Sequence, residues 1–217
     1  MSLSVLIPTY NRADVVKCCI EGLQKHLIYD GPINYHIGID GNDNTPQLLK
    51  DLDATLHTKP SGSLGANINR LVKASSDNFF LQMDDDHILQ KPLDLNPHIQ
   101  AMENNNQMGM IRLWGIAGHN YTATLKVSYW HIDWRSRELY IPSFRPNLKS
   151  RLFYETYGML PEGLKLGETE NAWCNQCKDI GIDRLNKWGA ECNVCVPVHL
   201  DGDLFDHIGD SWQLKGL

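Results

Sequence analysis

The sequence predicts an α/β protein in which helices flank a mostly parallel sheet. Short apolar runs rich in β-branched residues alternate, over the first ninety residues, with segments whose apolar side chains recur at helical spacing. The links between these segments are short, and polar turn residues follow the apolar runs. Alternation of this kind is typical of a parallel sheet with helical crossovers. No repeat or linker divides the 217 residues, so we expect a single domain, residues 1–217.

The first half of the chain supplies most of the predicted strands and helices. Residues 3–7 form a buried strand that ends at Pro8, and apolar residues from 16 to 27 recur at helical spacing. A second strand, 35–39, stops at the turn residues 40–43. A short helix at 46–52, a weak strand at 55–59, a helix at 64–72 and a strand at 78–83 follow.

The second half is less regular. Residues 108–113 and 192–200 have the character of strands, and residues 121–141 predict a β-ribbon or a long loop. Glu170, Trp173, Cys177 and Ile180 fall on one helical stripe, which predicts a helix that Gly181 ends.

Composition excludes several classes of protein. A net charge of −6 argues against a nucleic-acid binder, which needs a basic surface. An anionic ligand would therefore require local positive charge or a metal ion. No apolar run approaches the roughly 20 residues of a membrane span, and the N-terminus does not have the pattern of a signal peptide. With six cysteines and no such signal, we expect a soluble cytoplasmic protein with reduced thiols.

Three polar segments follow predicted strands, at 9–12, 40–42 and 84–87. In parallel α/β sheets, ligands bind at the carboxyl ends of the strands, so these segments should lie together. The third contains the consecutive residues Asp84, Asp85 and Asp86, whose like charges repel one another. Either a solvated turn holds them, or a positive group normally lies between them.

The motifs "SVLIPTYNR", "GIDGNDNT" and "GSLGANINRLVKASSDNFFLQMDDD", in this order and spacing, resemble the GT-A glycosyltransferases, family 2 in particular. The resemblance covers residues 3–90, is weak from 91 to 160, and returns at "GETENAWCNQCKDIG" and "FDHIGDSW". It implies a GT-A (Rossmann-like) fold, with a nucleotide-binding half at 1–90 and an acceptor and catalytic half at 91–217. A narrower resemblance, to the N-terminal glycosyltransferase domain of a chlorella-virus protein, would imply the host cytoplasm.

The resemblance assigns roles to the acidic segment. Asp84 and Asp86 match the D-x-D motif, so Asp86 is expected to bind Mn²⁺ or Mg²⁺ and Asp84 to face the ribose, with Asp85 assisting either. His207 is expected to complete the metal shell and Ser211 to contact the diphosphate. Nitrogen ligation suits Mn²⁺ better than Mg²⁺. The alternatives are a solvated acidic turn and a surface histidine.

The resemblance also assigns the rest of the donor site. Asp40 matches the aspartate that reads the uracil edge, a task that suits an acceptor-only carboxylate. The other residues expected to bind the donor are Pro8, Thr9, Tyr10, Asn11 and Arg12 in the first loop, and Lys59, Asn67 and Arg70 beside Asp40. For the arginines the alternative is a solvated helix charge, and for Asp40 an Asx turn.

The catalytic base should be a carboxylate near the start of a helix. Family members carry "E-D" about eleven residues before a glycine, and counting back from Gly181 reaches Thr169 and Glu170. Glu170 therefore replaces the family's aspartate, and its position on an otherwise apolar stripe suits general-base work. Glu168 is the second candidate, although a glutamate at that position also suits the helix dipole.

Together these expectations describe a metal-dependent transferase that moves a hexose or deoxyhexose from a UDP-sugar to a hydroxyl of a glycan or glycoprotein, with inversion. A sugar nucleotidyltransferase is one alternative, but it would carry a G-x-G-T-R-type loop where this chain has "PTYNR". A zinc module is the other, built on Cys174, Cys177, Cys192 and Cys195, although buried thiols explain these residues as well. Aromatic residues at 129, 130, 134 and 140 either stack on a sugar or anchor a core.

Overall fold

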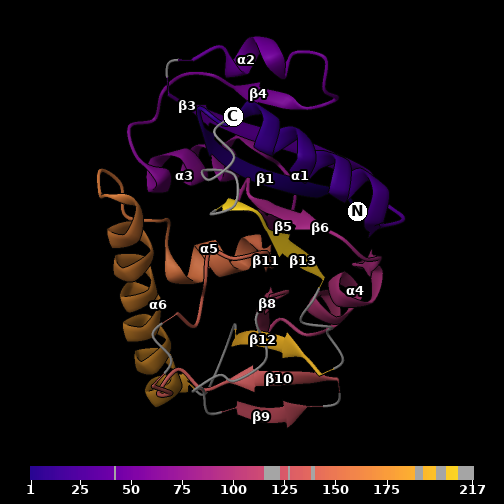
Figure 1. Ribbon diagram of the computed structural model, residues 1–217. Coiled ribbons are helices and arrows are strands. Elements are labelled where there is room, and N and C mark those ends of the chain that lie inside the picture. Colours follow the sequence, from indigo (N-terminus) through magenta and orange to yellow (C-terminus); the bar gives the residue numbers. More distant parts are fainter. Residues whose placement is uncertain are drawn as a thin grey trace.

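The computed structural model describes residues 1–41, 43–114, 123–126, 128–137, 140–188, 193–198 and 204–209. Its centre is a nine-stranded sheet in the order β4-β3-β1-β5-β11-β8-β12-β10-β9, with helices on both faces (Figure 1). The predicted α/β fold with a mostly parallel sheet in its first half is confirmed. In the part of the chain that is described, no helix is both long and apolar enough to cross a membrane.

The first half of the chain forms the parallel part of the sheet. The strands are β1 (Leu3–Tyr10), β3 (Ile33–Asp40), β4 (Thr55–His57) and β5 (Phe79–Gln82). β1 pairs in parallel with β3, where Tyr10 lies opposite Asp40, and with β5 on its other side. The last residues of β1 and β3 therefore lie side by side, as the sequence predicted.

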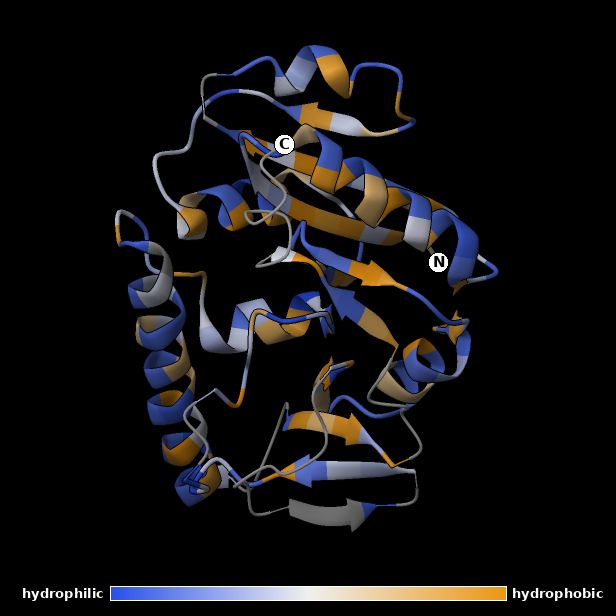
Figure 2. Cartoon of the chain, in the orientation of Figure 1, coloured by the Kyte–Doolittle hydropathy of each residue, from blue (hydrophilic) through white to orange (hydrophobic). Residues whose placement is uncertain are grey.

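Each face of this sheet has its own apolar core, because successive side chains of a strand point to opposite faces. Val5 and Ile7 of β1 pack with α1 (Ala13–His26), whereas Leu6 packs with α3 (Leu64–Ala74) and α6 (Leu166–Trp188). Figure 2 shows hydrophilic and hydrophobic residues alternating along α6, as expected for a helix with one face on the core. The sheet is thus held from both sides, which fixes the strand ends at the site.

The second half changes the direction of the strands. β11 (Asn147–Ser150) runs antiparallel to both β5 and β8 (Met108–Arg112) and joins the two halves. β12 (Asn193–Pro197) is parallel to β8, and an antiparallel ribbon of β9 (Ala123–Lys126) and β10 (Tyr129–Ile132) closes the edge. The predicted ribbon within 121–141 is confirmed for these described residues.

Shorter elements complete the molecule. The helices are α2 (Thr45–Leu48), α4 (Asn96–Asn104) and α5 (Arg151–Tyr157). The two small sheets pair β2 (Leu27–Ile28) with β7 (Leu93–Asp94), and β6 (His87–Leu89) with β13 (Phe205–His207). The second pairing matters for function, because it carries His207 to the acidic loop that precedes β6.

Several predicted helix ends are wrong. The short helix expected at 46–52 ends at Leu48. The helix expected to end at Gly181 continues to Trp188, and Leu27, expected at the end of the first helix, lies in β2. A side chain at position 181 would collide with the ring of Trp134, so Gly181 permits close packing and is not a helix cap. Trp134 is almost fully buried in the core on that face, so this aromatic residue serves packing and not sugar stacking.

Candidate active site

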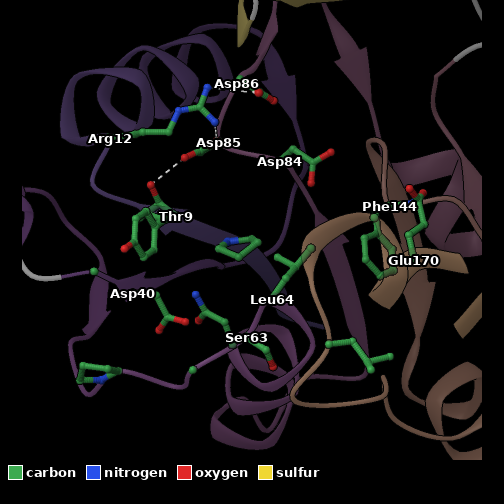
Figure 3. Close-up of a pocket in the computed structure, with 18 of the residues that line it drawn as sticks. Thr9, Arg12, Asp40, Ser63, Leu64, Asp84, Asp85, Asp86, Phe144 and Glu170 are labelled. Atoms are coloured by element: carbon green, nitrogen blue, oxygen red, sulfur yellow. Dashed lines mark hydrogen bonds and ion pairs between the residues drawn. The ribbon is translucent and has the colours of Figure 1, made fainter. Parts of the chain in front are cut away.

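A cleft of about 910 Å³ opens where β1, β3 and β5 end. Figure 3 shows Asp40 on one side of it, the acidic loop of Asp84, Asp85 and Asp86 on another, and Glu170 with Phe144 opposite. The predicted residues that line the cleft are Pro8, Thr9, Tyr10, Arg12, Asp40, Asn67, Asp84, Asp85, Asp86, Glu170 and His207. The prediction that three polar loops meet at one edge of the sheet is therefore confirmed.

The acidic loop is not a solvated turn. Asp85 is buried, and its carboxylate accepts hydrogen bonds from Thr9 Oγ1 at 2.6 Å and Arg12 Nη1 at 3.0 Å. Arg12 also donates to Asp86 at 3.2 Å, so one guanidinium holds two of the three aspartates. Burial raises the pKa of Asp85 to about 6, even though Arg12 and Thr9 oppose the shift. A positive group between the carboxylates thus offsets their mutual repulsion.

Asp86, His87 and His207 form a candidate metal site. Their ligand atoms lie within 4.8 Å of one another, and no other group of three or more potential ligands exists among the described histidines, cysteines and carboxylates. His87 Nδ1 is buried and lies 3.2 Å from the Asp86 carboxylate, an ion-pair contact without the geometry of a regular hydrogen bond. A buried nitrogen that makes no regular hydrogen bond, with two further ligand atoms beside it, fits a divalent ion.

The protonation of this loop also suits cation binding. Burial alone would raise the pKa of Asp86, but His87, Arg12 and His207 outweigh burial and lower it to about 2. Asp86 is therefore ionised at neutral pH. Burial and the like charges of Asp86 and Asp85 raise the pKa of Asp84.

The C-terminal segment is docked closely on the acidic loop. The amide of Ile208 donates to the carbonyl of Asp86 at 3.0 Å, and His207 Nε2 lies 3.6 Å from the Asp86 carboxylate. A side chain at Gly209 would approach that carboxylate to 2.5 Å, so a larger residue here would displace the Asp86 side chain. Ser211, predicted to contact the diphosphate, lies outside the described residues.

Asp40 is held on the opposite side of the cleft. Its carboxylate accepts hydrogen bonds from the amide of Ser61 at 3.0 Å and from the Ser61 hydroxyl at 2.5 Å, and Arg70 lies 3.5 Å away. Arg70 also donates to Asn67 at 2.7 Å, and Asn67 in turn donates to the carbonyl of Gly38 at 2.8 Å. These contacts fix Asp40 at the end of β3, so an Asx turn is not its role.

Several predicted donor residues occupy supporting positions. Arg70 bonds to the carbonyl of Lys59, whose exposed side chain does not line the cleft. Asn11 also lies outside the lining and adopts a positive φ of 53°. Its Oδ1 accepts from the amide of Asp43 at 3.4 Å, so it joins the loops that follow β1 and β3. These residues therefore support the loops around the cleft without lining it.

The two glutamates at the start of α6 differ clearly. Glu170 faces the cleft, and its Oε1 accepts a hydrogen bond from the amide of Phe144 at 2.9 Å. Glu168 is exposed and bonds back to the amide of Lys165 at 3.3 Å, as in a capping box. Glu168 therefore has a structural explanation, and Glu170 is the carboxylate in position to reach a substrate.

A second cavity of about 240 Å³ adjoins the first. It shares Asp84, Phe144, Glu170 and His207 with the main cleft and adds His87, Trp114 and Arg145. Trp114 follows β8, and its ring packs edge-on against His87 at a centroid distance of 5.1 Å. Sequence reasoning missed Trp114, Phe144 and Arg145, because no motif marks the loops that carry them.

The cysteine hypothesis finds no support in the described residues. Cys174 and Cys177 are buried inside α6, and Cys195 is buried in β12. None of the three belongs to a group of potential metal ligands in the described part of the molecule. Cys192, the fourth residue of the hypothesis, lies outside that part.

Several solved structures share this fold. TarS from S. aureus (residues 1–349) is 20% identical with a TM-score of 0.64, and the match covers 92% of this chain and 58% of that one. The same residues of TarS in complex with UDP-GlcNAc match at 18% identity and TM-score 0.61, covering 94% and 60%. The mannosyltransferase PcManGT from Pyrobaculum calidifontis, in complex with GDP-Man and Mn²⁺, is 13% identical with a TM-score of 0.58. That match covers 99% of this chain and 60% of that one.

This chain thus spans about three fifths of the length of these structures. The likeness establishes the GT-A fold, as the motifs predicted, whereas the narrower viral resemblance finds no support in these matches. No curated protein matches the sequence. The family model described as "Glycosyl transferase family 2" matches residues 4–155, which include β1, β3, β5 and the acidic loop. The chain therefore belongs to glycosyl transferase family 2.

Proposed function

We propose that the protein transfers a hexose or deoxyhexose from a UDP-sugar to a hydroxyl of a glycan or glycoprotein, with inversion at the anomeric carbon. One observation carries the proposal: a single cleft holds Asp40, the acidic loop and Glu170 on three different walls. A nucleotide, a metal-bound diphosphate and an attacking hydroxyl each require one of these walls.

Asp40 supports uracil as the base. A carboxylate accepts hydrogen bonds only, so it suits the N3–H of uracil. Its oxygens have about four lone-pair sites in total, so the bonds from Ser61 leave room for a ligand. TarS has been solved with UDP and UDP-GlcNAc and PcManGT with GDP-Man, so related folds accept different bases. Tyr10, which is exposed at the mouth of the cleft, would stack on the base.

The metal would be held by Asp86 with His207 and His87. Their two nitrogens and one carboxylate favour Mn²⁺ over Mg²⁺. When bound, the ion neutralises the negative charge that develops on the departing nucleoside diphosphate. Arg12 would stabilise the acidic loop before the metal binds, since it bridges Asp85 and Asp86. Asp84, between the metal site and Glu170, would face the ribose or the sugar.

Glu170 would act as the general base. The amide of Phe144 holds one carboxylate oxygen, and no described residue donates a hydrogen bond to the other. That oxygen would accept the proton of an acceptor hydroxyl as the hydroxyl attacks the anomeric carbon. The acceptor would enter by the second cavity, where Trp114 offers an aromatic surface beside Glu170. Attack on the face of the anomeric carbon opposite the leaving diphosphate would produce inversion.

A cytoplasmic location would agree with the thiols. None of the five described cysteines forms a disulfide, as expected in a reducing compartment.

The proposal is tested by incubating the protein with UDP-, GDP-, CDP- and dTDP-sugars in Mn²⁺, Mg²⁺ or EDTA and measuring the release of nucleoside diphosphate. We expect release from one or more UDP-sugars, fastest with Mn²⁺ and absent with EDTA. Release of pyrophosphate from a sugar phosphate and UTP would support the nucleotidyltransferase instead. Inactivity with every UDP-sugar, with Mn²⁺ present and the protein folded, would contradict the proposal.

A further inference from the structure

Lys149 is a fully buried lysine in the middle of the sheet. It lies on β11, between β5 and β8, and its side chain has no exposed surface. Its Nζ donates to Gln82 Oε1 at 2.7 Å and lies 4.8 Å from the ring centroid of Trp173. No described carboxylate is within ion-pair distance of it. Lysines are almost never buried in this way without a charged partner, so this position requires an explanation.

A chain of hydrogen bonds connects Lys149 to the candidate base. Gln82 accepts from Lys149 through Oε1 and donates through Nε2 to the carbonyl of Phe144 at 3.5 Å. The amide of Phe144 then donates to Glu170 Oε1 at 2.9 Å. The orientation of the Gln82 amide is fixed by this pattern, because a lysine can only donate.

The same residues also meet through their rings. The Phe144 ring lies 5.6 Å from the ring of Trp173, which stands one turn after Glu170 on α6 and under the Lys149 ammonium. The segment that carries Phe144 is therefore held on one side by Gln82 and on the other by α6. Lys149 contacts both supports, with its ammonium on Gln82 and over the ring of Trp173.

We propose that Lys149 is a positioning residue that acts through Gln82 and the Phe144 peptide to aim the carboxylate of Glu170. The inference rests on the proposed function, because it assigns Glu170 a catalytic role. It explains why the site is not filled by methionine or leucine, which would pack there without the cost of removing a charge from water.

The charge of Lys149 also bears on the site. Asp84 and Glu170 face it from the cleft, Cys174 and Cys177 from α6, and Tyr154 from α5. Burial lowers the pKa of Lys149 to about 7, while Cys177, Cys174, Asp84 and Glu170 raise it. The lysine therefore keeps part of its charge near neutral pH. This charge opposes the rise in the pKa of Asp84 that burial and the neighbouring carboxylates cause.

Lys149→Met separates positioning from a purely structural role. The variant keeps the length of the side chain and removes the donor and the charge. We expect an unfolding temperature at pH 7 equal to or above that of the wild type, since a buried charge is lost. UDP affinity should be unchanged, whereas kcat should fall roughly 10- to 100-fold because Glu170 is misplaced.

The matched variants sharpen this test. Gln82→Glu keeps an acceptor for Lys149 but removes the donor to Phe144, so kcat should fall as in Lys149→Met although the lysine stays paired. Gln82 Oε1 also accepts a hydrogen bond from the Tyr154 hydroxyl at 3.3 Å. Tyr154→Phe removes only this second donor, so its kcat should stay near that of the wild type. Lys187→Met, at an exposed lysine of α6, controls for loss of charge.

Hydrogen exchange at the Phe144 amide provides a readout that does not depend on activity. The amide should lose protection in Lys149→Met and Gln82→Glu and keep it in Tyr154→Phe. Unchanged protection and unchanged kcat in a folded Lys149→Met would overturn the proposal, as would a fall in activity that only follows a fall in unfolding temperature. If protection falls but Glu170→Gln is fully active, the chain of contacts exists and the proposed function of Glu170 fails.

Discussion

The two halves of the chain build the site in different ways. In residues 1–90, parallel strands end at one edge of the sheet. Thr9 and Asp40 lie at the ends of β1 and β3, and the acidic loop follows β5. In residues 91–217, the strands run in both directions, and the carboxylate at the cleft comes from the start of a helix. The first half supplies ligands by regular topology, and the second supplies Glu170 by packing α6 across the sheet.

This difference predicts that the two halves of the chain control different steps of the reaction. Groups on the strand ends of the first half should govern binding of the donor. Groups brought across by α6 and the loops of the second half should govern turnover and the acceptor. Variants that change one property and leave the other would support this division, and variants that change both would break it.

The largest effect is expected at Glu170. Glu170→Gln keeps the size of the side chain and the bond from Phe144 but cannot take a proton, so turnover should fall roughly 10²- to 10⁴-fold. UDP affinity, measured by calorimetry, should stay within error. Glu168→Gln is the matched control and should cost little, because Glu168 caps the helix. If Glu168→Gln abolishes activity and Glu170→Gln does not, the assignment of the base is wrong.

A change at Asp86 should weaken donor binding, unlike the change at Glu170. Asp86→Ala removes the proposed metal ligand, so Mn²⁺-dependent UDP affinity should fall at least roughly 100-fold. The fold should persist, since one charge leaves a cluster of like charges. Calorimetry with and without Mn²⁺ checks this, and Asp53→Ala, at an exposed aspartate, is the control. A variant that retains the full Mn²⁺ effect would show that the ion binds elsewhere.

Asp40 tests how the first half selects the base. In the wild type, UDP should compete better than CDP or GDP for the donor site. Asp40→Asn should reduce this preference by roughly 10- to 100-fold, the range for one hydrogen bond to a charged group. Competition binding with the three diphosphates measures the effect. Equal competition by all three in the wild type would remove the base-reading role from Asp40.

Trp114 tests the second half in the same manner, with the smallest effect. Trp114→Ala should raise the KM for the acceptor by roughly 5- to 10-fold, as expected for one aromatic contact, and leave the donor KM unchanged. Trp188→Ala, at an exposed tryptophan outside both cavities, is the control. A rise in the donor KM alone would place the second cavity on the donor side.

Local sequence determined most of the donor side. The sequence predicted three of its strands, at 3–7, 35–39 and 78–83. Patterns of apolar residues close together in the chain indicate both burial and alternation with helices. Asp40 and the acidic loop follow these strands directly, so their meeting at one edge follows from parallel topology alone. Glu170 was assigned from the family motif, and its position on an otherwise apolar helical stripe supported that assignment.

Only the tertiary structure decided how these groups are held. β11 carries Lys149 between two strands from different parts of the chain, and β13 carries His207 to Asp86 across more than a hundred residues. Phe144 reaches Glu170 from a loop without any motif. The physical reason is that propensity and periodicity act over a few neighbouring residues, whereas these positions are set by hydrogen bonds and packing between distant segments.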